Sequence, residues 1–158
     1  MDEVNSIDEL IKQIKDDELK SSLPIIKLTA MKIWTPSIRI IKNYTSHDIE
    51  HSNRVAGYII KILNLYKNSK PLSDKERFLL SAAVCLHDIG MQCDIKKYKE
   101  IKEKAEKLGA RFNLEIKADT SSDFSPNEQN MIRENHHYLS AAWISFAHSN
   151  TDPIKETP

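Results

Sequence analysis

Apolar residues recur every three or four positions in several segments of the chain, the spacing that places side chains on one face of a helix. In the first such segment four residues form the apolar face: Ile7, Leu10, Ile11 and Ile14. Ser6 and Glu9 make a capping box in front of it, so the sequence predicts a helix over 6–20.

The same spacing predicts further helices along the rest of the chain. They are expected over 24–34, 46–67, 73–88, 94–108 and 125–146. Gly90 and Gly109 are expected to stop the third and fourth of these helices. The chain has only three glycines and no alternating apolar run of strand length, so we expect an all-α fold.

Composition narrows the class of protein. With 158 residues, of which 40% are hydrophobic, the chain is long enough for one domain with a core. The 23 basic residues equal the 23 acidic ones, so no overall field attracts nucleic acid or an anionic membrane. Cys85 and Cys93 fit no zinc or disulfide pattern, and the acidic N-terminus is unlike a signal peptide. We expect a cytoplasmic protein without a membrane partner.

We divide the expected domain into three parts. Helices over 1–44 pack on a core over 45–148, and the polar residues 149–158 form a linker or a frayed end.

Histidines carry the main chemical signal. Five of the six fall in three of the predicted helices: His47, His51, His87, His136 and His137. Three of them, His51, His87 and His136, stand four residues from an apolar position of their own helix and therefore lie on its apolar face. One such histidine alone is more often a hydrogen-bonded core residue. Three together, with Asp88 beside one of them, favour a shared metal site.

The types of ligand indicate the kind of metal. Neutral imidazoles with a carboxylate suit Mn, Fe, Co, Ni or Zn, and the lack of a cysteine argues against a purely structural zinc. Adjacent residues on a helix point about 100° apart, so His87 and Asp88 share one ion only if it lies close to the helix end. Gly90 is expected to leave room for that approach. One divalent metal with positions open for water is predicted, and a second is an alternative.

Three segments with this order and spacing resemble the HD metal-dependent phosphohydrolase superfamily. They are "HSNRV" at 51–55, "AAVCLHDIGM" at 82–91 and "HHYLSAAWI" at 136–144, within a resemblance over 45–143. Within that superfamily the chain looks most like HD domains joined to ATPase modules in bacterial conflict and stress proteins. The resemblance implies an HD-type helical bundle that hydrolyses a phosphomonoester or phosphodiester bond.

The resemblance also implies a role for each histidine. His51, His87 and Asp88 match the ligands of the first metal, so Asp88 is a ligand at the catalytic centre. The pair His136 and His137 resembles the double histidine that serves a second metal in two-metal members.

His47 stands one helical turn before His51, like the histidine that protonates the leaving oxygen in the cyclic-nucleotide phosphodiesterase branch. The alternative is a surface residue at the start of a helix. Asp48 matches no ligand of the superfamily, and the helix dipole already explains an aspartate at this position.

Arg54 and Arg133 lie one turn from candidate site histidines, and either can bind a phosphate oxygen or form an ordinary salt bridge. A nucleotide-like phosphate ester is the expected substrate, and single-stranded nucleic acid is less favoured by the zero net charge.

Two departures from the superfamily keep other readings open. The distal aspartate has no counterpart on a helix, because Asp152 lies in the polar tail, and no histidine lies between Asp88 and His136. One alternative is a piece of a longer protein, truncated at the C-terminus. Another is an inactive regulatory HD domain that binds metal or nucleotide and signals to a partner or downstream ATPase domain. A third is a helical bundle whose histidines only satisfy one another. The oligomeric state is open.

Overall fold

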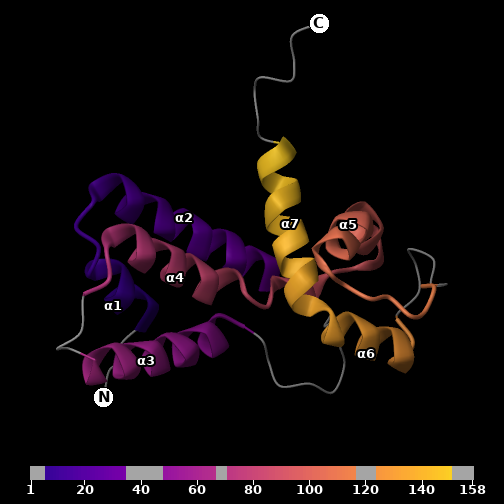
Figure 1. Cartoon of the computed structure of the whole chain (residues 1–158), viewed down its shortest axis with the longest axis horizontal. Helices are drawn as coiled ribbons and strands as arrows, with labels where there is room; N and C mark the ends of the chain where they lie inside the picture. The colour runs from indigo at the N-terminus through magenta and orange to yellow at the C-terminus, as the bar shows by residue number, and fades with distance from the viewer. Residues whose placement is uncertain (1–5, 35–47, 67–70, 117–123, 151–158) are drawn as a thin grey trace, which may run out of the picture. The chain divides into compact units, whose positions relative to one another are not determined.

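The structure is a computed structural model that describes residues 6–34, 48–66, 71–116 and 124–150. Within these ranges every regular element is helical, with seven α-helices and one short 3-10 helix (Figure 1). The all-α fold expected from the sequence is therefore confirmed. Contacts divide the chain into two compact units, and one division falls between Leu86 and His87. Each unit has its own helices and its own buried residues.

The first unit contains four helices: α1 (Ser6–Lys12), α2 (Asp17–Trp34), α3 (Ile49–Leu65) and α4 (Asp74–Leu86). α4 packs against the other three, and α1 also packs against α3. The core of this unit is built from ten buried residues: Ile7, Leu10, Ile11, Ile14, Leu23, Ala30, Ala56, Ile60, Val84 and Cys85. Fully burying one isoleucine, leucine or valine side chain stabilises a fold by about 1.5–3 kcal/mol. The aliphatic residues of this core therefore hold the four helices together.

The first two helices differ from the prediction. The helix expected over 6–20 stops after α1, and α2 begins inside that range. Asp16 explains the new start, because its carboxylate accepts a hydrogen bond from the N–H of Leu19 at 3.0 Å and so caps α2. The start expected at Pro24 is also wrong, since Pro24 lies inside α2.

Two sets of hydrogen bonds hold the start of α4: a capping box, and contacts of Asp74 with the preceding turn. The predicted capping box is confirmed: the N–H of Glu76 donates to Ser73 Oγ at 3.3 Å, and the N–H of Ser73 donates to Glu76 Oε2 at 2.7 Å. Asp74 Oδ2 also accepts hydrogen bonds from the backbone N–H groups of Lys15 and Asp16, at 3.1 and 2.8 Å. The turn between α1 and α2 is thus tied to the beginning of α4.

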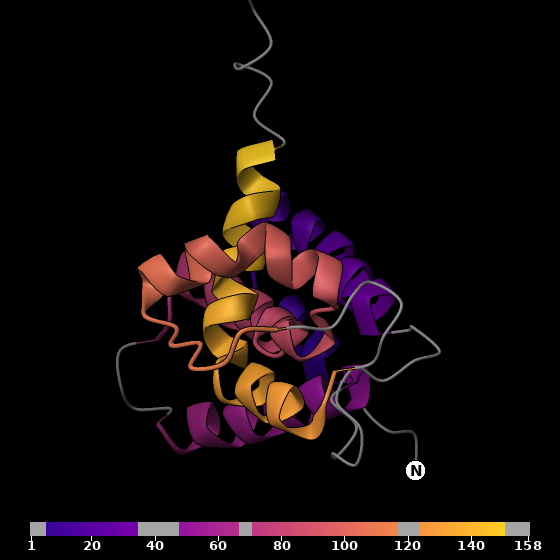
Figure 2. The ribbon, with the colours of Figure 1, turned by 90° about the vertical axis from the view of Figure 1, so that its right-hand side faces the viewer.

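The second unit contains four helical elements: the 3-10 helix η1 (Ile89–Gln92), α5 (Ile95–Leu108), α6 (Pro126–Glu134) and α7 (His136–Asn150). α7 is the central element, because it packs against η1, α5 and α6. Figure 2 shows α5 crossing α7, with α6 at one end of it. The α5 helix ends as predicted at Gly109, whose φ of 116° favours glycine.

One helix was expected over 125–146, and the structure has two. The capping box of Ser125 and Glu128 starts α6 as predicted, but the chain turns at Asn135 before α7 begins. The Asn135 side chain is buried and holds this turn. Its amide donates to the carbonyls of Met131 and Arg111 at 3.0 and 3.2 Å, and its Oδ1 accepts from the N–H of Arg111 at 2.9 Å. The turn makes His136 the first residue of α7.

Both cysteines, Cys85 and Cys93, are free thiols and are buried. In the ranges that the structure describes, no single helix is both long enough and apolar enough to cross a membrane, although one bent pair, Asp74–Gln92 with Ile95–Leu108, could do so by length and composition.

Candidate metal centre

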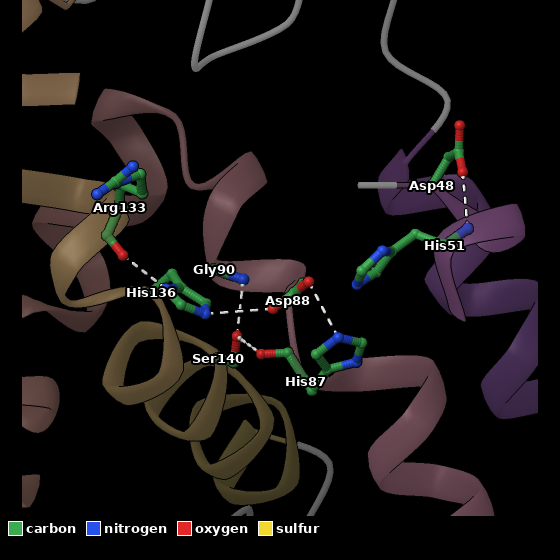
Figure 3. A network of polar contacts seen from close by, with 8 residues as sticks. All are labelled: Asp48, His51, His87, Asp88, Gly90, Arg133, His136 and Ser140. Carbon is green, nitrogen blue, oxygen red and sulfur yellow. Dashed lines mark hydrogen bonds and ion pairs between the residues drawn. The ribbon is translucent and has the colours of Figure 1, made fainter. Parts of the chain in front are cut away.

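Asp88 lies in the turn that precedes η1 and is 5% exposed. Its side chain makes no capping bond to η1, and each carboxylate oxygen instead faces an imidazole. Oδ2 lies 2.9 Å from Nε2 of His87, and Oδ1 lies 3.2 Å from Nε2 of His136 (Figure 3). A buried carboxylate is costly without a positive or hydrogen-bonding partner. The second unit therefore holds a His/Asp cluster in which both oxygens of a buried carboxylate face the nitrogens of half-buried imidazoles.

His136 is oriented by the backbone of the preceding helix. Its Nδ1 lies 2.5 Å from the carbonyl oxygen of Arg133. A carbonyl only accepts hydrogen bonds, so Nδ1 carries a proton and Nε2 is the nitrogen presented to Asp88. Histidines that bind metals are commonly held in this way by a carbonyl or carboxylate on the other ring nitrogen.

The charge of His136 follows from the same contacts. The hydrogen bond to Asp88 raises the pKa of His136 above its ordinary value, burial opposes the shift, and the Arg133 carbonyl adds to it. The contact with Asp88 thus favours the protonated form of the imidazole, the form that can act as the counter-ion of Asp88 when no metal ion is bound. A divalent cation would take the place of that proton.

His87 and Asp88 are adjacent in the chain and offer an imidazole nitrogen and a carboxylate oxygen within 4.8 Å of each other. The carbonyl of His87 accepts a hydrogen bond from Ser140 Oγ at 2.7 Å. Imidazole and carboxylate donors without a thiolate suit the divalent metals expected from the sequence. The residues present thus fit a divalent metal ion.

Gly90 has a different use from the one expected. A Cβ added at Gly90 would lie 2.2 Å from the carbonyl oxygen of His136 and 2.8 Å from the backbone nitrogen of Ser140. The space beside Gly90 is therefore filled by the backbone of α7. Gly90 also lies inside η1 rather than ending the chain of helical turns. Its lack of a side chain lets α7 pack closely on η1 and brings His136 to Asp88.

Two other candidates lie at the start of α3. His51 and Arg54 belong to the first unit, in the first turns of α3, where His51 is half-buried and Arg54 exposed. Asp48 is the N-cap of α3, and its carboxylate accepts from the N–H of His51 at 3.0 Å (Figure 3). His47 lies outside the described residues.

His137 is exposed, and its ring packs 4.0 Å, centroid to centroid, from that of Tyr138. It stands 5.5 Å from the ring of His136 in the same measure. Of the double histidine, His136 therefore contacts Asp88 in this structure.

Ser140 was missed by the sequence reasoning. It lies four residues after His136, one turn along α7, and it is 3% exposed. A polar residue one turn from a candidate ligand, on the apolar face of a helix, was the signal that could have identified it. Arg133 was singled out for its guanidinium, whereas its carbonyl is the group that contacts His136.

Comparison with known proteins identifies the family to which the chain belongs. The model of the family described as HD-CE matches residues 41–157, which include all three histidine segments. No curated protein and no solved structure matches the chain. Because the family model covers most of its length, the chain belongs to the HD-CE family.

Proposed function

We propose that the chain is a metal-dependent phosphohydrolase that acts on a nucleotide-type phosphomonoester or phosphodiester. The observation that carries this proposal is the buried Asp88, whose two oxygens face the Nε2 atoms of His87 and His136 in a chain of the HD-CE family. The proposed ligands of the metal are His51, His87 and Asp88, which together supply two imidazoles and one carboxylate. His136 and His137 are the candidates for a second ion.

A divalent metal bound there would lower the pKa of a water molecule and polarise a phosphoryl oxygen. The chain's own residues would bind and orient the substrate and move the proton. His47 is proposed to protonate the leaving oxygen, as the HD resemblance implies, with His137 as the alternative. Arg54 and Arg133 are proposed to bind phosphate oxygens through their guanidinium groups.

His136 has two uses in this proposal. Its Nδ1 is already occupied by the Arg133 carbonyl, so only Nε2 can bind an ion or hold a proton next to Asp88. A proton held there would keep the Asp88 carboxylate in place until a metal arrives.

A regulatory domain without catalytic turnover is the second candidate function, and the composition of α7 favours it. The helix from His136 to Asn150 contains no aspartate or glutamate, although the HD pattern has a later acidic ligand on a helix. A domain of this kind would bind metal or nucleotide and signal to a partner or downstream ATPase domain.

The experiment combines metal content with turnover. The purified chain would be analysed for bound metals, loaded in turn with Mn, Co, Ni or Zn, and incubated with a panel of nucleoside mono-, di- and triphosphates and cyclic nucleotides. We expect a bound divalent metal, and release of phosphate or of a ring-opened nucleotide. Asp88→Asn should lose both, whereas Asp94→Asn, which changes an aspartate that only caps α5, should keep both.

Metal binding without any turnover would favour the regulatory reading. The absence of metal binding in the unchanged chain would overturn the proposal.

A further inference from the structure

Ser140 joins α7 to both sides of the Asp88 turn. Its hydroxyl accepts a hydrogen bond from the N–H of Gly90 at 2.9 Å and donates one to the carbonyl of His87 at 2.7 Å (Figure 3). One side chain thus pairs two backbone groups that flank Asp88. At 3% exposure, Ser140 makes these bonds away from bulk water.

The backbone around Asp88 connects two helical elements. The α4 helix ends at Leu86, and η1 starts at Ile89, so His87 and Asp88 lie in a turn between two helical ladders. The carbonyls at the end of a helix have no partner within that helix. Ser140 supplies the partner for the carbonyl of His87, so it fixes the turn that carries both candidate ligands.

Gly90 allows η1 to pack closely against the first turn of α7. Its Cα approaches the first turn of α7 so closely that a Cβ would collide with the His136 carbonyl. The hydroxyl of Ser140 and the missing side chain of Gly90 therefore hold η1 against α7 backbone to backbone. His136 begins α7, so this contact also sets the separation between its Nε2 and the Asp88 carboxylate.

Burial alone does not explain two strong hydrogen bonds at a serine. Ser81 on α4 is 0% exposed, and its hydroxyl has no hydrogen-bond partner among the described residues. A serine can thus be buried in this fold without a hydrogen bond from its hydroxyl to another described residue. Ser81 is a matched reference for the effect of removing a buried hydroxyl.

We propose that Ser140 is a positioning residue of the metal centre, which holds the His87–Gly90 turn so that Asp88 and His136 keep a fixed separation. The inference rests on the proposed function, because it assumes that this cluster binds a divalent metal. Removing a residue that orients metal ligands typically weakens metal binding by about 10–100-fold. Ser140→Ala should therefore weaken binding by a factor in this range and leave the protein folded.

The test titrates Co²⁺ into metal-free protein and follows both the dissociation constant and the visible absorption of the bound ion. We expect Ser140→Ala to bind about 10–100-fold more weakly with an altered spectrum. Ser81→Ala should match the unchanged chain in both. Ser140→Thr, which keeps the hydroxyl, should restore much of the affinity.

A control separates positioning from general loss of stability. Ile132→Val removes a methylene from a fully buried residue of the same unit and should lower the urea midpoint without changing the dissociation constant or the spectrum. If Ile132→Val weakens Co²⁺ binding as much as Ser140→Ala does, Ser140 acts only through stability and the proposal is wrong.

Three further outcomes keep the inference open to refutation. If Ser140→Ala fails to fold, amide exchange in the unchanged protein decides: the Gly90 amide should be protected, and exchange as fast as that of an exposed amide would overturn the proposal. An unchanged chain that binds no metal would refute the proposed function. If Ser140→Ala and the unchanged chain bind metal equally tightly, only the proposed role of Ser140 is refuted.

Discussion

Oδ1 of Asp88 lies 3.2 Å from Nε2 of His136, so the turn before η1 and the first residue of α7 share one charged contact. The Arg133 carbonyl fixes the proton on the far side of the imidazole and leaves this nitrogen as the variable one. A proton or a metal ion can bind there, and each excludes the other. The contact therefore links acidity, stability and metal binding in one unit.

Without metal, the chain should be less stable at higher pH because of His136. Its folded pKa is raised above the value near 6.5 of an unfolded chain, chiefly by the hydrogen bond to Asp88. This contribution is fully present below about pH 6.5 and is lost as the pH rises through the raised pKa. Urea midpoints measured with chelator at pH 6 and pH 8.5 should fall for the unchanged chain. They should fall less for His136→Asn, and equal falls would contradict this contribution.

The two neighbours Asp48 and His51 should respond differently to mutation. Asp48 accepts the N–H of His51 as the N-cap of α3, so Asp48→Ala should cost about 0.5–2 kcal/mol of stability and leave metal bound. His51→Ala should remove a proposed ligand and empty the site. Metal content after dialysis and urea midpoints would be compared for both variants. Equal metal retention by the two would exclude His51 as a ligand.

Cys85 should make the first unit sensitive to alkali. Burial raises the pKa of its thiol to about 11, above the value near 8.5 in an unfolded chain. The thiol's contribution is fully present below about pH 8.5 and is lost as the pH rises through about 11. Cys85→Ala should be less stable at pH 7.5 because it leaves a small cavity, but its urea midpoint should decline less between pH 8 and 10.5. Parallel declines in the two proteins would show that Cys85 does not cause the loss.

Two glycines should give different results when replaced by alanine. Gly109 has a φ of 116°, and an added Cβ would lie 3.2 Å from the ring of Tyr138, so Gly109→Ala should lower stability by about 1 kcal/mol or more. Gly57 lies within α3, where alanine stabilises a helix by about 0.5–1 kcal/mol relative to glycine. A Cβ added at Gly57 would lie 3.3 Å from Oγ of Ser6, at the end of a side chain. Thermal unfolding should rank Gly109→Ala well below Gly57→Ala. The reverse order would show that the αL conformation of Gly109 is not maintained in solution.

Sequence reasoning predicted those features that depend on local patterns. The capping boxes at Ser73 and Ser125 and the stop at Gly109 were found because the residues that make them lie within one turn of one another. The all-α class followed from the same spacing.

The break at Asn135 and the use of Gly90 were missed because contacts between distant residues decide them. The break at Asn135 depends on hydrogen bonds to Arg111, which is 24 positions away. The use of Gly90 depends on α7, which only the folded chain brings to it. The histidine pattern predicted which residues to examine, but it could not show that the Asp88 carboxylate would face two imidazoles or that Ser140 would bind the turn between them.

The packing of α5 on α7 gives the second unit a natural optical reporter. The ammonium group of Lys97 lies 5.3 Å from the ring centroid of Trp143 and 5.0 Å from that of Phe146, both on α7. The chain has one other tryptophan, Trp34, so a Trp34→Phe chain would emit indole fluorescence from α7 alone. Its emission would then follow the helix that carries His136 and Ser140 while metal, acid or urea is added, without any attached dye.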